Sequence, residues 1–260
     1  MKEHVRVLML GDVSGSAGMG ALFLGLSSLV RDVKADFVII NGENASAGFG
    51  IAVQDYQNLK KMGADVITSG NHIWQKDEIF SILEGNDDIL RPLNYPEPCI
   101  GHGYTVRKKG AFTIAVINAQ GRVMMSPIDD PFKRVDKVLR DIKKETPLVF
   151  VDFHAEDTLE KEAFAFAFDG RVTAVVGTHT HVQTADEKIL PGGCAYITDL
   201  GITGVTDAVI GSDPQKSIER QLTQLPIKSE VASGESHIQG VVIEADATTG
   251  KAVSIERIDR

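Results

Sequence analysis

Two histidines, His179 and His181, stand one residue apart behind an apolar run. The run covers residues 173–176 and stops at Gly177. A buried strand that ends at a glycine delivers the side chains after it to the carboxyl edge of its sheet. Two neutral imidazoles at such an edge are competent metal ligands. A lone His-x-His pair also occurs by chance in surface loops, so this prediction needs support from other segments.

Four more apolar runs end in the same way, beside a glycine or on a metal-competent side chain. They cover residues 5–10, 37–40, 66–68 and 148–151. The carboxyl ends of neighbouring strands in an α/β sheet open onto one crevice. We therefore expect one site to gather the side chains that follow the five runs: Asp12, Glu43, Asn44, Asn71, His72, His154, His179 and His181. None offers a thiolate, and oxygen and imidazole donors favour divalent ions such as manganese, iron or zinc.

These side chains are sufficient for two metal ions. Two divalent ions about 3.5–4 Å apart can share a bridging hydroxide and hold the attacking and leaving oxygens of a phosphoryl group. The predicted ligands divide into a bridge, Glu43, and two sets: Asp12, Asn44 and His181 for one ion, and Asn71, His154 and His179 for the other. His72 directly follows a ligand, so we predict that it protonates the leaving alkoxide or holds a phosphoryl oxygen.

The segment between the first strand and the first helix is rich in glycine. Its glycines follow the spacing G-x-x-x-G-x-x-G-x-G from Gly11 to Gly20, which differs from the G-x-G-x-x-G of dinucleotide-binding loops. We predict a glycine-rich turn that lets the backbone approach metal and phosphate, followed by a helix over residues 21–33.

Helical and strand patterns alternate along most of the chain, and this order predicts an α/β fold with a largely parallel sheet. The helical patterns cover residues 53–62, 75–83, 131–145 and 158–168. A hairpin is predicted from residues 104–108 and 112–118, with Lys109-Gly110 at its turn. Residues 195–199 suit a further strand, and residues 239–245 and 252–258 alternate as an antiparallel pair does.

Residues 119–131 form a connection that is long for its position. Long ordered loops are typical of lids and of contacts between subunits. We therefore expect this loop to border the metal site, and contacts in a homo-oligomer are the alternative role. Arg122 within it suits either a phosphate contact or a surface hydrogen bond. Asp186 and Asp199 suit either hydrogen bonds to the ligating histidines or simple turn and cap roles.

Length and composition set the broad class. The chain has 260 residues, of which 43% are hydrophobic and 24% charged, and this predicts one α/β domain over residues 1–260. No segment approaches the roughly 20 apolar residues of a membrane span, and the N-terminal apolar run stops at Gly11, short of a signal-peptide core. We therefore expect a cytoplasmic protein without a membrane partner.

The net charge and the number of cysteines limit which binding partners and which kinds of site are expected. A formal net charge of −9 repels polyanions and disfavours binding of bulk nucleic acid. A small phosphorylated substrate stays open, because bound divalent cations would dominate the charge of the site. Cys99 and Cys194 are the only cysteines and have no second cysteine nearby in sequence, which argues against a disulfide framework and a zinc–thiolate site.

Four motifs carry a specific resemblance. They are INGEN at residues 40–44, SGNH at 69–72, VDFHAE at 151–156 and GTHTHVQTAD at 177–186. Together with the opening Gly-Asp, they resemble the bacterial YmdB family of the calcineurin-like metallophosphoesterase superfamily. The resemblance implies a four-layer α/β-β/α sandwich, a dinuclear centre of iron or manganese, and phosphodiesterase activity on 2′,3′- or 3′,5′-cyclic nucleotides.

The chain departs from the wider superfamily at two positions. The usual Asp-x-His opening reads Asp12-Val13-Ser14, and the usual bridging aspartate is Glu43, with Asn44 beside it. Both changes fit the YmdB pattern. One histidine ligand is thereby absent from the first ion, and Asn44 is the residue that compensates for it.

Two other functions share the same residues. One is a regulatory nucleotide-binding protein that uses the metal centre for recognition with little turnover. His72 favours an enzyme over this alternative, because binding alone needs no acid. The other is a phosphomonoesterase, which would favour a basic pocket for a dianion. Apart from Arg122, no cluster of arginine or lysine neighbours the motifs.

Overall fold

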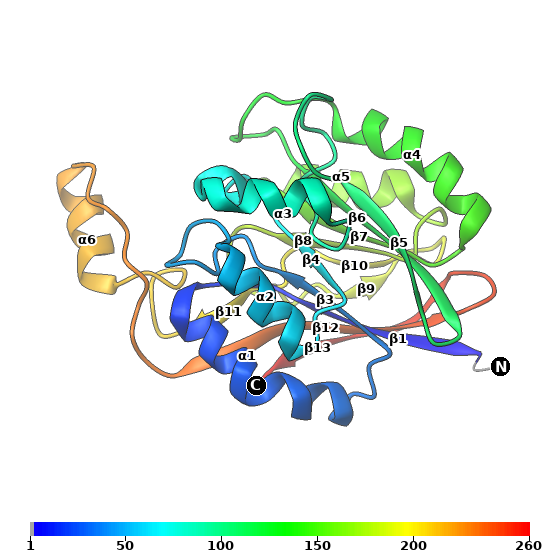
Figure 1. Ribbon diagram of the computed structural model, residues 1–260, viewed down its shortest axis with the longest axis horizontal. Coiled ribbons are helices and arrows are strands. Elements are labelled where there is room, and N and C mark those ends of the chain that lie inside the picture. The colour runs from blue at the N-terminus through cyan, green and yellow to red at the C-terminus, as the bar shows by residue number, and fades with distance from the viewer. Residues whose placement is uncertain (1–2) are drawn as a thin grey trace.

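The computed structural model describes residues 3–260 as two β-sheets packed face to face, with helices on their outer faces (Figure 1). The first sheet has the order β2-β11-β12-β1-β3-β4, and β13 pairs with β12. Its strands are β1 (His4–Leu10), β2 (Asp12–Val13), β3 (Phe37–Asn41), β4 (Val66–Thr68), β11 (Ile202–Val205), β12 (Ser236–Asp246) and β13 (Ala252–Asp259). The first and the penultimate strands in sequence, β1 and β12, therefore lie side by side at its centre.

The second sheet has the order β5-β6-β7-β8-β10-β9. Its strands are β5 (Tyr104–Lys109), β6 (Phe112–Gln120), β7 (Val149–His154), β8 (Ala174–Thr178), β9 (Lys188–Ile189) and β10 (Ala195–Ile197). The strands β6, β7, β8 and β10 run parallel, as the alternation of strands and helices predicts. The predicted hairpin around Lys109-Gly110 and the predicted C-terminal antiparallel pair are both confirmed.

The helices form the two outer layers. They are α1 (Gly15–Asp32), α2 (Val53–Met62), α3 (Phe80–Gly85), α4 (Pro131–Glu145), α5 (Thr158–Phe168) and α6 (Pro214–Thr223), with short 3-10 turns η1 (Ile73–Gln75) and η2 (Asp77–Ile79). Apolar side chains of α1 and α2 pack on the first sheet, and those of α4 and α5 pack on the second. The result is the four-layer α/β-β/α sandwich. Within residues 3–260, no helix is long and apolar enough to cross a membrane.

A shared apolar core lies between the two sheets. Along β1, Val5, Val7 and Met9 face this core, whereas Leu8 and Leu10 face the helices on the other side. Successive side chains of a strand point to opposite faces, so a strand buried on both faces is apolar throughout. The continuous apolar runs in the sequence have this cause.

The helices α4 and α5 begin where the sequence predicts. The carboxylate of Asp130 accepts hydrogen bonds from the backbone N–H of Phe132 and Lys133, with Pro131 in the first turn. Asp157 caps α5 by accepting from the N–H of Glu160. Such caps satisfy N–H groups that have no partner within the helix, and proline fits the first turn because its missing N–H is not needed there.

The glycine-rich segment is helical from Gly15, so the prediction of a loop up to residue 20 was wrong. A Cβ atom at Gly18 would lie 2.1 Å from the carbonyl oxygen of Thr203, which is in β11. At Gly11, a Cβ atom would lie 2.1 Å from the carbonyl oxygen of Gly201. These two glycines let α1 and the end of β1 pack against the backbone around β11.

The predicted helix over residues 75–83 was also wrong in part. The chain instead forms η1, η2 and the short α3, because Lys76 has extended backbone angles of φ −126° and ψ 109° that interrupt the helix. Trp74 lies at this interruption, 5.1 Å from the ring of Tyr95 and 6.2 Å from that of Phe80. It therefore packs as an anchor at the start of the next helix.

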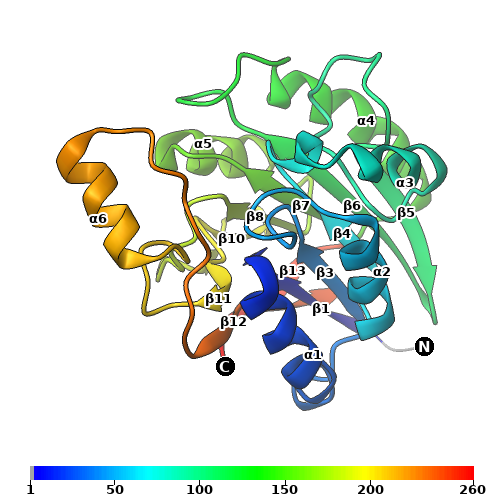
Figure 2. The same cartoon turned by 60° about the vertical axis from the view of Figure 1, so that its left-hand side comes forward.

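One segment stands away from the four layers. Residues 206–231, which we call the α6 arm, project from the first sheet with α6 at their tip (Figure 2). No side chain of α6 is buried. The sequence patterns did not predict this helix, because it is short and only Ile218 and Leu222 repeat at helical spacing along it.

Candidate metal centre

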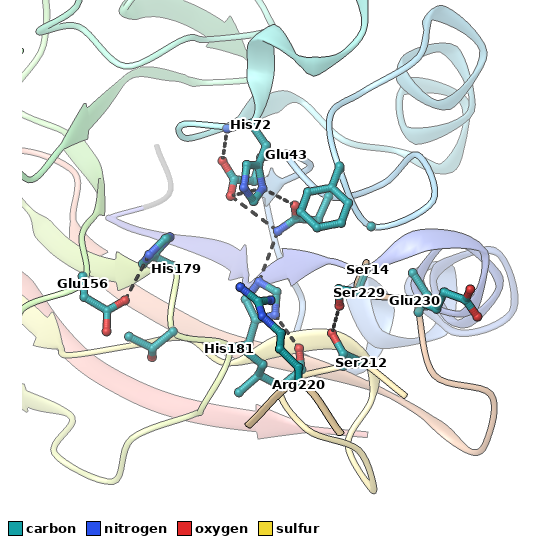
Figure 3. Close-up of a pocket in the computed structure, with 17 residues that line it drawn as sticks. Ser14, Glu43, His72, Glu156, His179, His181, Ser212, Arg220, Ser229 and Glu230 are labelled. Atoms are coloured by element: carbon teal, nitrogen blue, oxygen red, sulfur yellow. Dashed lines mark hydrogen bonds and ion pairs between the residues drawn. The ribbon is translucent and has the colours of Figure 1, made fainter. Parts of the chain in front are cut away.

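The carboxyl ends of strands from both sheets meet at one site. Asp12 lies in β2, Glu43 and Asn44 follow β3, Asn71 and His72 follow β4, His154 ends β7, and His179 and His181 follow β8. Seven of the eight predicted side chains are linked by contacts with one another, Asn71 directly precedes one of them, His72, and five of the eight line the same cavity (Figure 3). Parallel strands explain this convergence, because their carboxyl ends lie at the same edge of a sheet.

Three of these side chains form a group that could hold a metal ion: Glu43, His154 and His179. One ligand atom from each lies within 4.8 Å of the others. The Nε2 atom of His154 is 3.1 Å from Oε1 of Glu43 and 3.0 Å from Nδ1 of His179. Two imidazole nitrogens and a carboxylate oxygen are a suitable set for a divalent transition-metal ion.

A second set lies on the other side of Glu43. Asp12 Oδ1 is 3.6 Å from Nε2 of His181. The amide nitrogen of Asn44 is 3.1 Å from that same Nε2 atom and 3.4 Å from both Asp12 Oδ1 and Glu43 Oε1. An amide binds a metal through its oxygen, so ligation by Asn44 requires its side-chain amide to turn over. Glu43 thus lies between the two predicted ligand sets.

His72 stands beside both sets. Its Nδ1 atom is 2.7 Å from Oδ1 of Asn44 and 3.3 Å from Oε1 of Glu43. Its backbone N–H donates to Oε2 of Glu43 at 3.2 Å, and its ring contacts the edge of Phe49 with the centroids 5.0 Å apart. Burial lowers the pKa of His72 and outweighs the opposing effect of Glu43.

The donors present fit a bound metal ion. Asn71 Oδ1 is buried and has no hydrogen-bond partner within residues 3–260. Buried polar atoms are nearly always paired, so this oxygen is suited to an ion. At Gly70, a Cβ atom would lie 2.2 Å from Nε2 of His154 and 2.3 Å from Oε2 of Glu43. Only glycine lets this loop bring Asn71 and His72 so close to the two ligands.

The charges of the site depend on one another because the site is buried. Burial opposes ionisation of Asp12 and Glu43, yet His181 and His154 respectively hold the pKa of each carboxyl below its usual range. Burial also opposes protonation of these two histidines, but the carboxylates raise the pKa of each ring to about 9. Burial and the neighbouring His154 lower the pKa of His179 to about 4. The carboxylates therefore require positive charge here, which a divalent cation supplies.

The turn that carries the last two histidines is strained. His179 has φ 103° and His181 has φ 63°, a region that residues with a side chain rarely adopt. The carboxylate of Asp199 accepts from the backbone N–H of Thr180 at 3.1 Å, and it forms an ion pair with the fully buried Lys161 at 2.8 Å. This buried pair holds the strained backbone in place.

Two alternative roles were predicted for Asp199 and Asp186, and the structure shows the second of them, the turn and cap role. Neither contacts an imidazole: Asp199 holds the backbone of Thr180, and Asp186 accepts hydrogen bonds from the backbone N–H and the hydroxyl of Thr198. The outward nitrogens of two histidines have other partners. His179 Nε2 is 3.1 Å from Oε2 of Glu156, and His181 Nδ1 is 2.9 Å from the carbonyl oxygen of Ile210 in the α6 arm.

The crevice opens into a cavity of about 400 Å³. Its wall includes Phe49 from the loop after β3. It also includes Arg220 from the α6 arm (Figure 3). Arg220 is the only arginine or lysine in this wall, and its side chain has no ion pair or hydrogen bond within the described residues. Nothing in the sequence singled out Arg220, because it belongs to no motif and follows no strand.

No residue of the loop 119–131 lines this cavity, although the backbone N–H of Gly121 at its start donates to the carbonyl oxygen of His154 at 3.0 Å. The expectation that the loop borders the metal site therefore holds only where the loop begins. The guanidinium of Arg122 lies 3.6 Å from the carboxylate of Asp130 in the same loop. The backbone N–H groups of Arg122 and Val123 donate to the carboxylate of Glu160 in α5. The loop is therefore tied to its own end and to α5, and Arg122 has the surface role.

The site and its motifs can be compared with known proteins. A family model described as "YmdB-like protein" matches residues 8–258. The chain belongs to this family. A 2′,3′-cyclic-nucleotide 2′-phosphodiesterase of Bacillus subtilis is 48% identical to this YmdB-like protein over 254 residues, which cover 98% of the chain and 96% of the relative. The resemblance that the motifs suggested is therefore confirmed.

Solved structures agree with the fold of this YmdB-like protein. A hypothetical protein from Thermus thermophilus superposes with a TM-score of 0.90 at 37% identity, covering 98% of this chain and 99% of that one. A structure described as a novel phosphatase from Mycoplasma pneumoniae superposes with a TM-score of 0.93 at 36% identity, covering 100% of this chain and 94% of that one. The similarity thus extends over both sheets and all the strand ends of the site.

Proposed function

We propose that the protein is a metal-dependent phosphodiesterase that hydrolyses small cyclic nucleotides, with 2′,3′-cyclic nucleotides as its main substrates. The observation that carries this proposal is the position of Glu43. Its Oε1 atom is 3.1 Å from Nε2 of His154 on one side and 3.4 Å from Nδ2 of Asn44 on the other. A carboxylate between two ligand sets suits a bridge, and the Bacillus subtilis relative acts on the 2′ ester of a 2′,3′-cyclic nucleotide.

The residues would hold two divalent ions, iron or manganese, in the division that the sequence predicts. Glu43 would bridge them, Asp12, Asn44 and His181 would bind one ion, and Asn71, His154 and His179 would bind the other. Two such ions supply a nucleophile from water at neutral pH and neutralise charge on the phosphoryl oxygens. The unpaired oxygen of Asn71 and the carboxylates' need for positive charge support this assignment.

His72 is the proposed acid. Hydrolysis forms a bond between phosphorus and the oxygen of water and breaks the bond between phosphorus and O2′, so a proton must reach the leaving O2′ atom. His72 lines the cavity and is not needed as a metal ligand. Its ring contacts Phe49, and once the amide of Asn44 turns its oxygen to the metal, Nδ2 of Asn44 would face Nδ1 of His72. The neutral ring, which the lowered pKa of His72 favours, would then carry its proton on Nε2 and donate it from there. A positioned acid of this kind contributes about 10²–10⁴-fold to turnover.

Arg220 and Phe49 are the proposed contacts for the rest of the substrate. Arg220 is unpaired within the described residues and can donate to a substrate oxygen, whereas the ring of Phe49 offers an apolar surface to a nucleoside. A single arginine in the wall suits the single negative charge of a cyclic phosphodiester better than the dianion of a phosphomonoester. The cavity therefore favours a phosphodiesterase over a phosphomonoesterase.

Turnover and metal content measured together test the proposal. Protein purified without chelator should contain close to two transition-metal ions per chain and should convert 2′,3′-cyclic AMP to the 3′-monophosphate. Chelation should abolish turnover, and added manganese should restore it. Protein that holds both ions and binds 2′,3′-cyclic AMP without hydrolysing it or 3′,5′-cyclic AMP would instead support the regulatory alternative.

A further inference from the structure

A chain of buried hydrogen bonds leads away from the metal centre behind His154. The strands β7 and β8 are parallel with His154 opposite Thr178, and both side chains are fully buried. The Nδ1 atom of His154 is 2.8 Å from the hydroxyl oxygen of Thr178. That hydroxyl donates to Oδ1 of Asp152 at 2.7 Å. Neither Thr178 nor Asp152 belongs to the predicted ligand set.

The carboxylate of Asp152 acts only as an acceptor in this chain. It is 1% exposed, and three donors converge on its two oxygens. The amide of Asn41 donates to Oδ2 at 3.0 Å, the hydroxyl of Thr68 donates to Oδ2 at 2.5 Å, and the hydroxyl of Thr178 donates to Oδ1. These donors come from β3, β4 and β8, so both sheets fix the position of this carboxylate.

The hydrogen bonds of Thr178 then determine which ring nitrogen of His154 carries the proton. A threonine hydroxyl has one proton and two lone pairs. The Thr178 proton is directed to Asp152, and one lone pair receives the Asn41 amide at 3.3 Å. The remaining lone pair faces Nδ1 of His154, which must therefore be the N–H of the pair. In the neutral ring, the other nitrogen, Nε2, then carries a lone pair and faces Glu43 and His179.

We propose that Thr178 and Asp152 are positioning residues that fix His154 as the Nδ1–H tautomer and so direct its Nε2 lone pair to the metal ion. This inference rests on the proposed function only in that it assumes His154 to be a ligand. Partners of this kind orient a ligating imidazole and raise its basicity, and their loss typically costs about 10–100-fold in metal affinity.

The other two histidines are fixed by different means. His179 has the partly exposed carboxylate of Glu156, and His181 has the carbonyl oxygen of Ile210. Loss of the hydroxyl of Thr178 should therefore weaken one ion of the proposed pair and spare the ion held by Asp12 and His181. A general structural defect would weaken both ions.

The variants Thr178→Val and Thr178→Ser provide a matched test. Valine keeps the shape of threonine and removes the hydroxyl, whereas serine keeps the hydroxyl. Metal-free protein is titrated with manganese against a competing chelator. In Thr178→Val, the ion that His154 holds should bind about 10–100-fold less tightly than in the wild type. Thr178→Ser should stay within about threefold of wild type, and the other ion should be unchanged in both.

The tautomer is measured independently of activity and of metal. Nitrogen-15 spectra of the histidine rings in metal-free protein at alkaline pH, where the ring is neutral, should show wild-type His154 with its proton on Nδ1. Thr178→Val should show a mixture of the two tautomers. Asp152→Asn gives a second variant if Thr178→Val does not fold, and we expect it to weaken the same ion, because an amide there cannot accept all three donors.

Two results would overturn the inference: a wild-type His154 protonated on Nε2, or a Thr178→Val variant with unchanged metal affinity and an unchanged tautomer. Failure of the proposed function looks different. Wild-type protein that binds no divalent ion would refute the metal centre, while the nitrogen-15 spectra of the metal-free protein would still decide whether Thr178 and Asp152 set the tautomer.

Discussion

The floor of the site and the α6 arm beside it are built in opposite ways. On the floor, half of the eight side chains that follow the strands are buried and the other half are half-buried, and hydrogen bonds from several strands hold them. On the arm, no side chain of α6 is buried, and the one α6 residue in the cavity, Arg220, has no partner within residues 3–260. We infer from this difference that the floor fixes the chemistry and the arm selects the substrate. Changes on the floor should therefore cost far more than equal changes on the arm.

The largest difference in turnover between floor and arm is expected when a glutamate in each region is replaced by glutamine. Glu43→Gln should lose both ions and reduce turnover by at least about 10⁴-fold, because a neutral amide cannot bridge two cations. Glu230→Gln, in the arm wall of the same cavity, removes only an ion pair with Lys216 and should stay within about threefold of wild type. Metal analysis and turnover of 2′,3′-cyclic AMP measure both. A fully loaded, active Glu43→Gln variant would mean that the bridge is elsewhere.

Deletion of the proposed acid should separate metal binding from chemistry. His72→Ala should keep both ions and lower turnover by about 10²–10⁴-fold on 2′,3′-cyclic AMP. The loss should be smaller on bis-nitrophenyl phosphate, because nitrophenolate leaves without much help from an acid. Metal content and the two rates are measured on the same preparation. Loss of metal in this variant would make His72 a ligand, and full turnover with full metal content would remove it from the mechanism.

A pair of lysine substitutions tests stability in the two regions. Lys161→Met leaves the buried carboxylate of Asp199 without its cation and should lower the free energy of unfolding by about 3–5 kcal/mol. Lys216→Met breaks the exposed ion pair with Glu230 on the arm and should change the free energy of unfolding by less than about 1 kcal/mol. Unfolding in urea measures both. Equal effects would contradict the difference between floor and arm.

The smallest effect is expected at the unpaired arginine. Arg220→Ala should raise the KM for 2′,3′-cyclic AMP by about tenfold and leave kcat nearly unchanged, since one charge-assisted hydrogen bond is lost in both ground and transition states. Arg122→Ala is the matched control and should alter neither constant, because Arg122 pairs with Asp130 outside the cavity. Steady-state kinetics of the two variants decide the point. An unchanged KM in Arg220→Ala would leave the arm without a role in substrate binding.

The same contrast explains what the sequence could predict. Ligand candidates such as Asp12, Glu43 and His154 were recognisable because each follows or ends an apolar run, and strand ends converge by the geometry of the sheet. Arg220 was missed because it belongs to no motif and follows no strand, and the two apolar residues at helical spacing in α6, Ile218 and Leu222, were too few to predict a helix. The partnership of Asp152 with Thr178 was missed because it depends on the register between β7 and β8, which local patterns do not contain.

The wrong predictions have equally specific causes. Gly18 was assigned to a turn, yet it is a helical residue that lets α1 touch β11, and composition alone does not distinguish these two uses of glycine. Except where it begins, the loop of residues 119–131 was wrongly placed at the site on length, but length cannot tell a lid from a loop tied to its own end, as Arg122 and Asp130 tie this one.

The strand order also dictates when the site can be assembled during synthesis. Asp12 lies opposite Ile202 in the β2–β11 pair, and β11 is held by β12, which spans Ser236–Asp246. Domains generally fold as units while the chain leaves the ribosome at about 5–20 residues per second. Asp12 is made among the first residues but gains its neighbouring strand only after about 190 more have been added. We therefore expect nascent chains to bind metal only once residues up to about 246 have emerged.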